Sequence, residues 1–454
     1  MKDLTEGNVA KLIFQFTLPM LIGNIFQQTY NIVDSVIVGN YLGKQALAAV
    51  GASFPIIFIL ISLVIGVASG MNIIVAQYFG AKDIEKVRRT IDTMYIFIFT
   101  ASLIVTVVGI YFSESMLRMT RLPEELIPTA TIYLQVYFAG VIFLFGFNAT
   151  SAVLRGLGDS KTPLYFLIIA SLANIVLVIL FVTVLKWGIA GAAAATVIAE
   201  GGAFITGAWY LNRTHPIINL SWRKPDFDWD ILRLSVRIGL PSGIQQTLFS
   251  LGMMALMWIV NRFGTNVIAA FSVAGRIESL AIMPAMNFSM ALATFTGQNI
   301  GANKYARLQS GLKSTLAMSA VTSVILTLVI VIFSQYVMRL FTSDMEVIRI
   351  GQEYLMITCS FYVVFSTLFT FNGLLRGAGD TWIPMLVSLF SLWLFRIPLA
   401  YFFSQHFGEK GIWWAIPIGW SFGAIVSFFY YKTGKWKTKA VVKHTTAEVI
   451  SDAV

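Results

Sequence analysis

The stretch LRGLGDSKTP at Leu154–Pro163 occurs a second time, as LRGAGDTWIP at Leu375–Pro384, 221 residues further along the chain. Each copy joins two long apolar segments and combines Arg, two Gly, Asp and Pro, which are residue types that form turns and begin helices. Other residues repeat at the same spacing, namely Asn40 and Asn261, Gly43 and Gly264, Gln77 and Gln298, Gly80 and Gly301, and Tyr133 and Tyr354. The spacing is close to half of the 454 residues, so the sequence predicts an internal duplication.

The composition is typical of a membrane protein. Hydrophobic residues make up 57% of the chain and charged residues only 12%, whereas soluble domains carry about 25% charged residues. Apolar segments of about 20 residues, the length that spans a bilayer, recur from end to end. In this setting the net charge of +10 indicates basic cytoplasmic loops and no nucleic-acid partner.

The apolar segments fall in two sets of six, which predicts an all-α polytopic membrane protein with twelve transmembrane helices. The first set lies near 12–38, 46–79, 91–113, 126–153, 163–185 and 189–211, and the second near 235–262, 266–297, 312–333, 350–374, 383–404 and 411–431. The predicted parts are an N-terminal six-helix lobe (1–211), a cytoplasmic connector (212–233), a C-terminal six-helix lobe (234–431) and a basic cytoplasmic tail (432–454).

The basic residues are distributed unevenly over the predicted loops. With the N-terminus in the cytoplasm, most of the 32 Lys and Arg fall on the cytoplasmic side, so we expect a multi-pass protein of the plasma (inner) membrane with both termini cytoplasmic. Each half has an even number of spans, and the two repeats are therefore parallel. Such repeats place a substrate site between the halves near the midplane and work by alternating access.

One face of the first span is polar. Asn24, Gln27, Asn31 and Asp34 follow a helical spacing, and Pro19 lies one turn before them. A carboxylate at membrane depth costs about 2.5–3.5 kcal/mol on insertion scales and marks ion or proton paths. Asp34 is therefore a candidate for ion coupling, with a structural contact to a neighbouring helix as the alternative. Pro19 is expected to act either in gating or as a static kink.

Three further polar residues inside predicted spans are candidates for the substrate cavity or its gating. Gln245 in the seventh span either lines the cavity or bonds to another helix. Glu200 lies in the sixth span, either as a functional residue of the cavity or solvated near the cytoplasmic end. Glu278, in the eighth, is either functional or paired with Arg276 or Arg396, and we favour the pairing.

Histidine and cysteine usage argues against an enzyme. Cys359 is the only cysteine, and His215, His406 and His444 all fall in predicted loops or the tail. This distribution excludes an internal disulfide framework and an intramembrane metal site with histidine ligands. No nucleophile and base are paired within the spans.

Four stretches together resemble the multidrug and toxic compound extrusion (MATE) family. They are NIVDSVIVGNYLGKQALAAVG from Asn31, the LRG turn, NIVLVILF from Asn174 and GIAGAAAATVIAE from Gly188. The resemblance covers roughly residues 10–435. It implies two six-helix bundles in a V shape around a central cavity. The seventh span has Phe249 or Ser250 where the NorM-like branch carries an acid, which places the chain nearer the DinF-like or general bacterial branch.

The resemblance also implies an ion-coupling site made of Asp34, Asn174 and Thr196. Val178 stands where many relatives have an acidic or polar residue, and the site thereby loses an oxygen ligand that Na+ would need. We therefore favour H+ over Na+ as the coupling ion, with Na+ at Asp34, Asn174 and Thr196 as the alternative. Apart from this ion no cofactor is expected.

The function expected from this resemblance is secondary active export of cationic or amphipathic drugs, in antiport with H+ or Na+. The expected partners are these small molecules and the lipid bilayer, and the expected state is a monomer. The alternative is a lipid-linked oligosaccharide flippase of the same superfamily. A flippase cavity should be basic to hold a diphosphate, but only Arg276 and Arg396 qualify as basic cavity residues, against the acids Asp34, Glu200 and Glu278.

Overall fold

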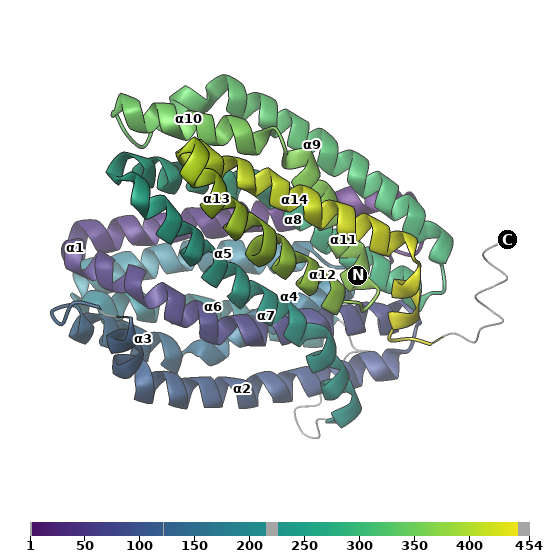
Figure 1. Ribbon diagram of the computed structural model, residues 1–454. Helices are drawn as coiled ribbons and strands as arrows, with labels where there is room; N and C mark the ends of the chain where they lie inside the picture. The colour runs from purple at the N-terminus through teal and green to yellow at the C-terminus, as the bar shows by residue number, and fades with distance from the viewer. Residues whose placement is uncertain (1, 121, 215–225, 444–454) are drawn as a thin grey trace. The chain divides into compact units, whose positions relative to one another are not determined.

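The computed structural model describes residues 2–120, 122–214 and 226–443, and these residues form helices and no strand (Figure 1). The α-helices of the first half are α1 (Val9–Gly80), α2 (Ile84–Met119), α3 (Ile127–Ala139), α4 (Val141–Gly156), α5 (Lys161–Ile179) and α6 (Gly188–Thr214). Those of the second half are α7 (Trp229–Val260), α8 (Thr265–Gly301), α9 (Tyr305–Arg339), α10 (Met345–Cys359), α11 (Tyr362–Gly377), α12 (Trp382–Leu389), α13 (Ile397–Phe407) and α14 (Glu409–Lys432). Short helical segments are η1 (Leu180–Val184), η3 (Asn261–Phe263), η4 (Phe390–Arg396) and η5 (Lys435–Lys439).

Helix α1 contains two membrane spans. It has 72 residues, and at 1.5 Å per residue it would be roughly 110 Å long, far more than the hydrocarbon core of about 30 Å. Gly43 interrupts it with a non-helical backbone at φ 83° and ψ 179°. Its repeat counterpart Gly264 has nearly the same backbone, φ 88° and ψ 175°, between η3 and α8. The two repeats therefore turn at the same glycine.

Two spans are bent at equivalent places. The α3–α4 pair bends by 48° and the α10–α11 pair by 49°. In the first pair the hydroxyl of Thr106 donates to the carbonyl of Phe138 at 2.8 Å, and in the second that of Thr327 donates to the carbonyl of Cys359 at 2.6 Å. These residues are related by the repeat spacing of 221. The same contact therefore satisfies a carbonyl at the end of α3 and of α10.

The number of spans agrees with the sequence prediction. Nine helices within the described ranges are long and apolar enough to cross a membrane, and the two bent pairs raise the number to eleven. Dividing α1 at Gly43 adds one more. The predicted all-α fold with twelve transmembrane helices is confirmed.

The LRG turns have the backbone that their glycines predict. Gly158 and Gly379 lie at φ 84° and φ 90°, a region that glycine enters at little cost. Asp159 caps α5, since its Oδ1 accepts from the amides of Lys161 and Thr162, both at 3.0 Å. The Asp of this copy thus begins a helix, as its residue type predicts.

Two compact units make up the described chain. Unit 1 contains Met1–Asp3 and Leu18–Gly243, and unit 2 contains Leu4–Thr17 and the chain from Ile244 on. Residues 215–225 of the predicted connector and 444–454 of the predicted tail lie outside the described residues. The lobe boundaries given above stay a prediction.

The short segments that precede α1 and α7 are held by hydrogen bonds. In unit 2, the amide of the buried Leu4 donates to Oε1 of Gln298 at 2.9 Å, and Asn299 donates to the carbonyl of Leu4 at 3.2 Å. In unit 1, the amide of Asp228 donates to the hydroxyl of Thr93 at 3.0 Å. Both chain segments are thus anchored by polar contacts to a helix of the unit in which they lie.

Unit 1 has an apolar core that includes Met71, Phe138 and Phe145, all fully buried. In unit 2, aromatic rings form the centre. Trp413 stacks on Phe271 with ring centroids 5.7 Å apart and meets Tyr354 edge to face at 4.9 Å. The hydroxyl of Tyr354 also donates a hydrogen bond to the carboxylate of Glu278.

Candidate functional site

The polar stripe of α1 is partly open to its surroundings. Asn24 and Asp34 are half-buried, while Gln27 and Asn31 are exposed. Asn31 donates to Gln28 at 3.4 Å, and Gln27 bonds to the hydroxyl of Tyr30. A membrane span with exposed amides needs water or polar partners beside it. The stripe therefore fits a helix face that lies against water or polar groups.

Asp34 is the residue of the stripe whose carboxylate has an unpaired buried oxygen. Its Oδ1 is buried and has no hydrogen-bond partner within the described ranges. Such an atom is costly to bury, and binding a proton or a cation removes the cost. Asp34 interacts electrostatically with Tyr30 on its own helix and with Tyr133 on α3.

Glu200 of α6 interacts electrostatically with the same tyrosines as Asp34. Tyr30 and Tyr133 each interact electrostatically with both carboxylates, and Tyr137 interacts with Glu200. The structure therefore brings Asp34 and Glu200, from different helices, to one tyrosine cluster. The described residues place no Lys or Arg in electrostatic contact with either carboxylate.

Asn174 and Thr196 are brought together, as the resemblance implies. Nδ2 of Asn174 donates to Oγ1 of Thr196 at 3.1 Å, which joins α5 to α6. Oδ1 of Asn174 is buried and unpaired. No hydrogen bond of the described chain joins Asp34 to either residue. A shared ion site of these three residues stays a prediction.

Among the described residues, no group of three or more His, Cys, Asp or Glu side chains is placed to hold a metal. The buried side chain at Val178 offers no oxygen to the Asn174 pair. A Na+ ion would depend on Asn174 Oδ1 and Thr196 Oγ1, both neutral, together with Asp34.

Pro19 lies buried within α1, which continues as a helix on both sides of it. The residue with a non-helical backbone in α1 is Gly43, so the interruption of this helix arises at the glycine and not at the proline. A gating role for Pro19 stays a prediction.

Gln245 belongs to a hydrogen-bond network between helices. Its Nε2 donates to the hydroxyl of Ser388 on α12 at 2.6 Å, and Arg376 of the second LRG turn donates to its Oε1. Both ends of the amide are therefore engaged within unit 2. This geometry favours the helix-bonding interpretation of Gln245 over a cavity lining.

Glu278 is paired, but mainly with a residue that the sequence did not indicate. The hydroxyl of Tyr354 donates to its Oε2, and Oε1 is buried without a partner in the described residues. Of the two predicted arginines, Arg396 is buried and interacts electrostatically with Glu278, whereas Arg276 is exposed. Within the described ranges no ion pair joins Glu278 to either arginine, and its hydrogen bond is to Tyr354. The favoured pairing with an arginine stays a prediction.

The tyrosines around Asp34 were missed by sequence reasoning about this site. Two signals could have found them. Tyr30 lies four residues before Asp34, which puts both on one helix face, and Tyr133 repeats as Tyr354. A tyrosine that is kept in both repeats and interacts with a carboxylate in each indicates a polar cluster.

The MatE family model matches this chain twice, over residues 19–180 and 241–402. One match falls in each half, so the predicted duplication is confirmed. The chain is 36% identical to the probable multidrug resistance protein YpnP of Bacillus subtilis (strain 168), with 96% of this chain and 97% of that protein covered. It is 32% identical to the probable multidrug resistance protein YoeA of the same organism, with coverage of 97% and 96%.

A solved structure has the same fold over its whole length. It is that of a multidrug resistance MATE family transporter of the MOP superfamily in an outward-facing conformation. The TM-score is 0.90 at 26% sequence identity, and the alignment covers 96% of this chain and 99% of that one.

Proposed function

Since the chain belongs to the MatE family, we propose that it is a secondary active exporter of cationic or amphipathic drugs, driven by antiport of H+. The protein is a membrane transporter and not an enzyme, in line with its full-length relatives. We further propose that it lies in a bacterial inner membrane with both termini in the cytoplasm, and that it is a monomer.

The observation that carries the proposal is the unpaired, buried Oδ1 of Asp34. A carboxylate in this position is stabilised either by a proton or by the positive charge of an organic cation. The two ligands therefore compete. Binding of H+ from one side of the membrane neutralises the site and releases the drug, and loss of the proton on the other side restores the affinity for the next cation.

The charge of the cluster supports cationic substrates. Asp34 and Glu200 act on the same tyrosines without a basic residue in electrostatic contact. An anion would meet two uncompensated acids there, while an organic cation meets two acids and the faces of aromatic rings, which attract cations.

The choice of H+ over Na+ rests on the ligands. Na+ would need several oxygens, but the position of Val178 supplies none, and Oγ1 of Thr196 already accepts a hydrogen bond from the amide of Asn174. A proton needs only the one oxygen of Asp34. Na+ bound by Asp34, Asn174 and Thr196 is the competing proposal.

The test is efflux of ethidium or norfloxacin from cells that express the wild type, Asp34→Asn, or the exposed control Asp230→Asn. The pH gradient and the Na+ gradient are imposed separately. We expect efflux driven by the pH gradient in the wild type and in the control, and loss of gradient-driven efflux in Asp34→Asn at equal membrane expression. Efflux driven only by Na+ would overturn the choice of ion. Unimpaired efflux in Asp34→Asn would remove Asp34 as the coupling site, and no efflux under either gradient would favour the lipid flippase.

A further inference from the structure

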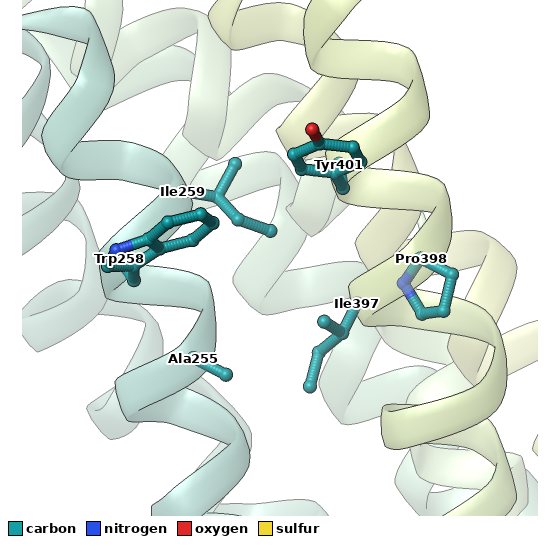
Figure 2. Close-up of a pocket in the computed structure, with 6 residues that line it drawn as sticks. All are labelled: Ala255, Trp258, Ile259, Ile397, Pro398 and Tyr401. Carbon is teal, nitrogen blue, oxygen red and sulfur yellow. The ribbon is translucent and has the colours of Figure 1, made fainter.

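Unit 2 contains an apolar groove between α7 and α13. Ala255, Trp258 and Ile259 line it from α7, and Ile397, Pro398 and Tyr401 line it from α13. Figure 2 shows these two rows of side chains facing one another across a gap. The cavity volume is about 380 Å³, within the range of small-molecule sites.

The groove lies where unit 1 has its acidic position. A shift by one repeat takes Asp34 to Ala255, so a methyl group stands in the groove in place of a carboxylate. None of the six lining residues is charged. A cation therefore finds no counter-charge in the groove, and its chemistry differs from that of the Asp34 cluster.

A positive charge is held at one end of the groove. The guanidinium of Arg262, in η3, lies 4.9 Å from the ring centroid of Trp258 and 5.6 Å from that of Tyr401. Both walls thus fix the same group by cation–π contacts. No carboxylate forms an ion pair with Arg262 within the described ranges, and the residue is exposed.

An arginine near the end of a span commonly reaches toward the membrane interface without a specific ligand. Here two observations go further. The guanidinium lies over rings from two helices, and those same rings line the apolar groove. An apolar groove with a cation beside it that has no ion-pair partner matches a ligand with an apolar chain and an anionic head.

The position along the span matches such a ligand in a bilayer. Helix α7 ends at Val260, and Gly264 makes the turn into α8, so Arg262 lies at the end of a span. Ala255 lies two turns earlier, within it. Trp and Tyr are the residues that accumulate where headgroups meet acyl chains. The groove therefore runs from headgroup level into the hydrocarbon region.

We propose that this groove binds one anionic phospholipid of the surrounding leaflet, with the lipid phosphate on Arg262 and an acyl chain between α7 and α13. A cationic drug fits less well because Arg262 repels it. The site is separate from the Asp34 cluster, and the inference does not depend on which ion drives transport.

The test uses Trp258 as a reporter, because this ring lies in the wall of the groove. The purified full chain in detergent is titrated with phosphatidylglycerol or with phosphatidylcholine, each carrying brominated acyl chains that quench tryptophan emission on contact. The signal of Trp258 among the 11 tryptophans is the difference from Trp258→Phe, measured for each variant. We expect phosphatidylglycerol to quench it at about fivefold lower concentration, since a basic residue near anionic lipid contributes about 1 kcal/mol.

The variants distinguish recognition of the lipid headgroup from binding of the acyl chain. In Arg262→Gln the two lipids should quench the Trp258 emission equally, and Arg262→Lys should keep the preference for phosphatidylglycerol. Ala255→Phe, which fills the groove, should weaken quenching by both. The matched control is Arg213→Gln, since Arg213 stacks in the same way on Trp209 of α6 at 5.1 Å, and it should change nothing.

Equal quenching by the two lipids in the wild type would overturn the proposal. So would a preference that persists in Arg262→Gln. Because Arg262 is exposed, its substitution leaves the fold intact and the result can be interpreted even if Ala255→Phe proves unstable.

Discussion

Tyr133 and Tyr354 occupy equivalent positions in the two repeats, and each faces a carboxylate of its own unit. Tyr133 interacts electrostatically with Asp34 and Glu200, and Tyr354 donates a hydrogen bond to Glu278. The tyrosine is thus retained, while its acidic partners come from different helices. In unit 1 they come from α1 and α6, and in unit 2 from α8.

Removing the hydroxyl of Tyr354 should destabilise unit 2. In Tyr354→Phe the Oε2 of Glu278 loses its hydrogen-bond partner, so that both oxygens of the carboxylate are unpaired in a buried setting, and the expected cost is about 1–3 kcal/mol. A lower midpoint of thermal unfolding in detergent would report this loss. The exposed Tyr41 gives the matched control, Tyr41→Phe. An unchanged midpoint in Tyr354→Phe would mean that this hydrogen bond contributes nothing to stability.

The Asn174 side chain should distinguish the two candidate ions. Asn174→Ala removes the unpaired Oδ1 and the bond to Thr196. If H+ binds Asp34 alone, efflux driven by a pH gradient should stay within about twofold of the wild type. If Na+ is bound, the loss of a ligand should reduce Na+-driven efflux by about tenfold, which corresponds to about 1.4 kcal/mol.

The control for Asn174→Ala is Asn148→Ala. Asn148 donates only to the carbonyl of Leu144 on its own helix, at 2.9 Å. Its removal should leave efflux under either gradient unchanged. A large loss of pH-driven efflux in Asn174→Ala, but not in the control, would contradict a site that needs only Asp34.

The close contact of α1 and α7 within unit 1 should tolerate no side chain at Gly239. A Cβ there would lie 2.4 Å from Cα of Val67, and backbone cannot move aside as a flexible side chain can. We expect Gly239→Val to lower stability by about 1–3 kcal/mol or more, as overpacking does. Yield of folded protein and its thermal midpoint measure the effect. Gly202→Ala, where a Cβ meets no atom within 4 Å, should behave like the wild type.

The sequence predicted the fold well because its signals are local or periodic. Span length, the repeat spacing and the Asp159 cap each depend on residues close in the chain or on one fixed offset. The pairing of Asn174 with Thr196 came from the family resemblance. Glu278 with Tyr354 is a contact over 76 residues, and side-chain types alone do not determine which of several tyrosines meets an acid.

The aromatic packing around Trp413 could not be predicted for the same reason. Phe271 and Trp413 stack across more than a hundred residues, and many aromatic residues of the chain could have taken either place. The groove between α7 and α13 is likewise a property of packing. Its residues read as ordinary apolar positions of two spans, and only their arrangement leaves a gap.

The equivalent glycines Gly43 and Gly264 should be equally sensitive to substitution. Gly43 and Gly264 have φ near 85° with ψ near 180°, a region that is essentially restricted to glycine and costs other residues about 1–3 kcal/mol. Gly43→Ala and Gly264→Ala should therefore lower the thermal midpoint by similar amounts, because a Cβ at either site meets no neighbour and only the backbone conformation is strained. Gly51→Ala, at a helical position of α1 with equally open space, should be neutral or slightly stabilising. If Gly43→Ala proved as harmless as Gly51→Ala, α1 would tolerate a different backbone at residue 43, and the turn would not depend on glycine.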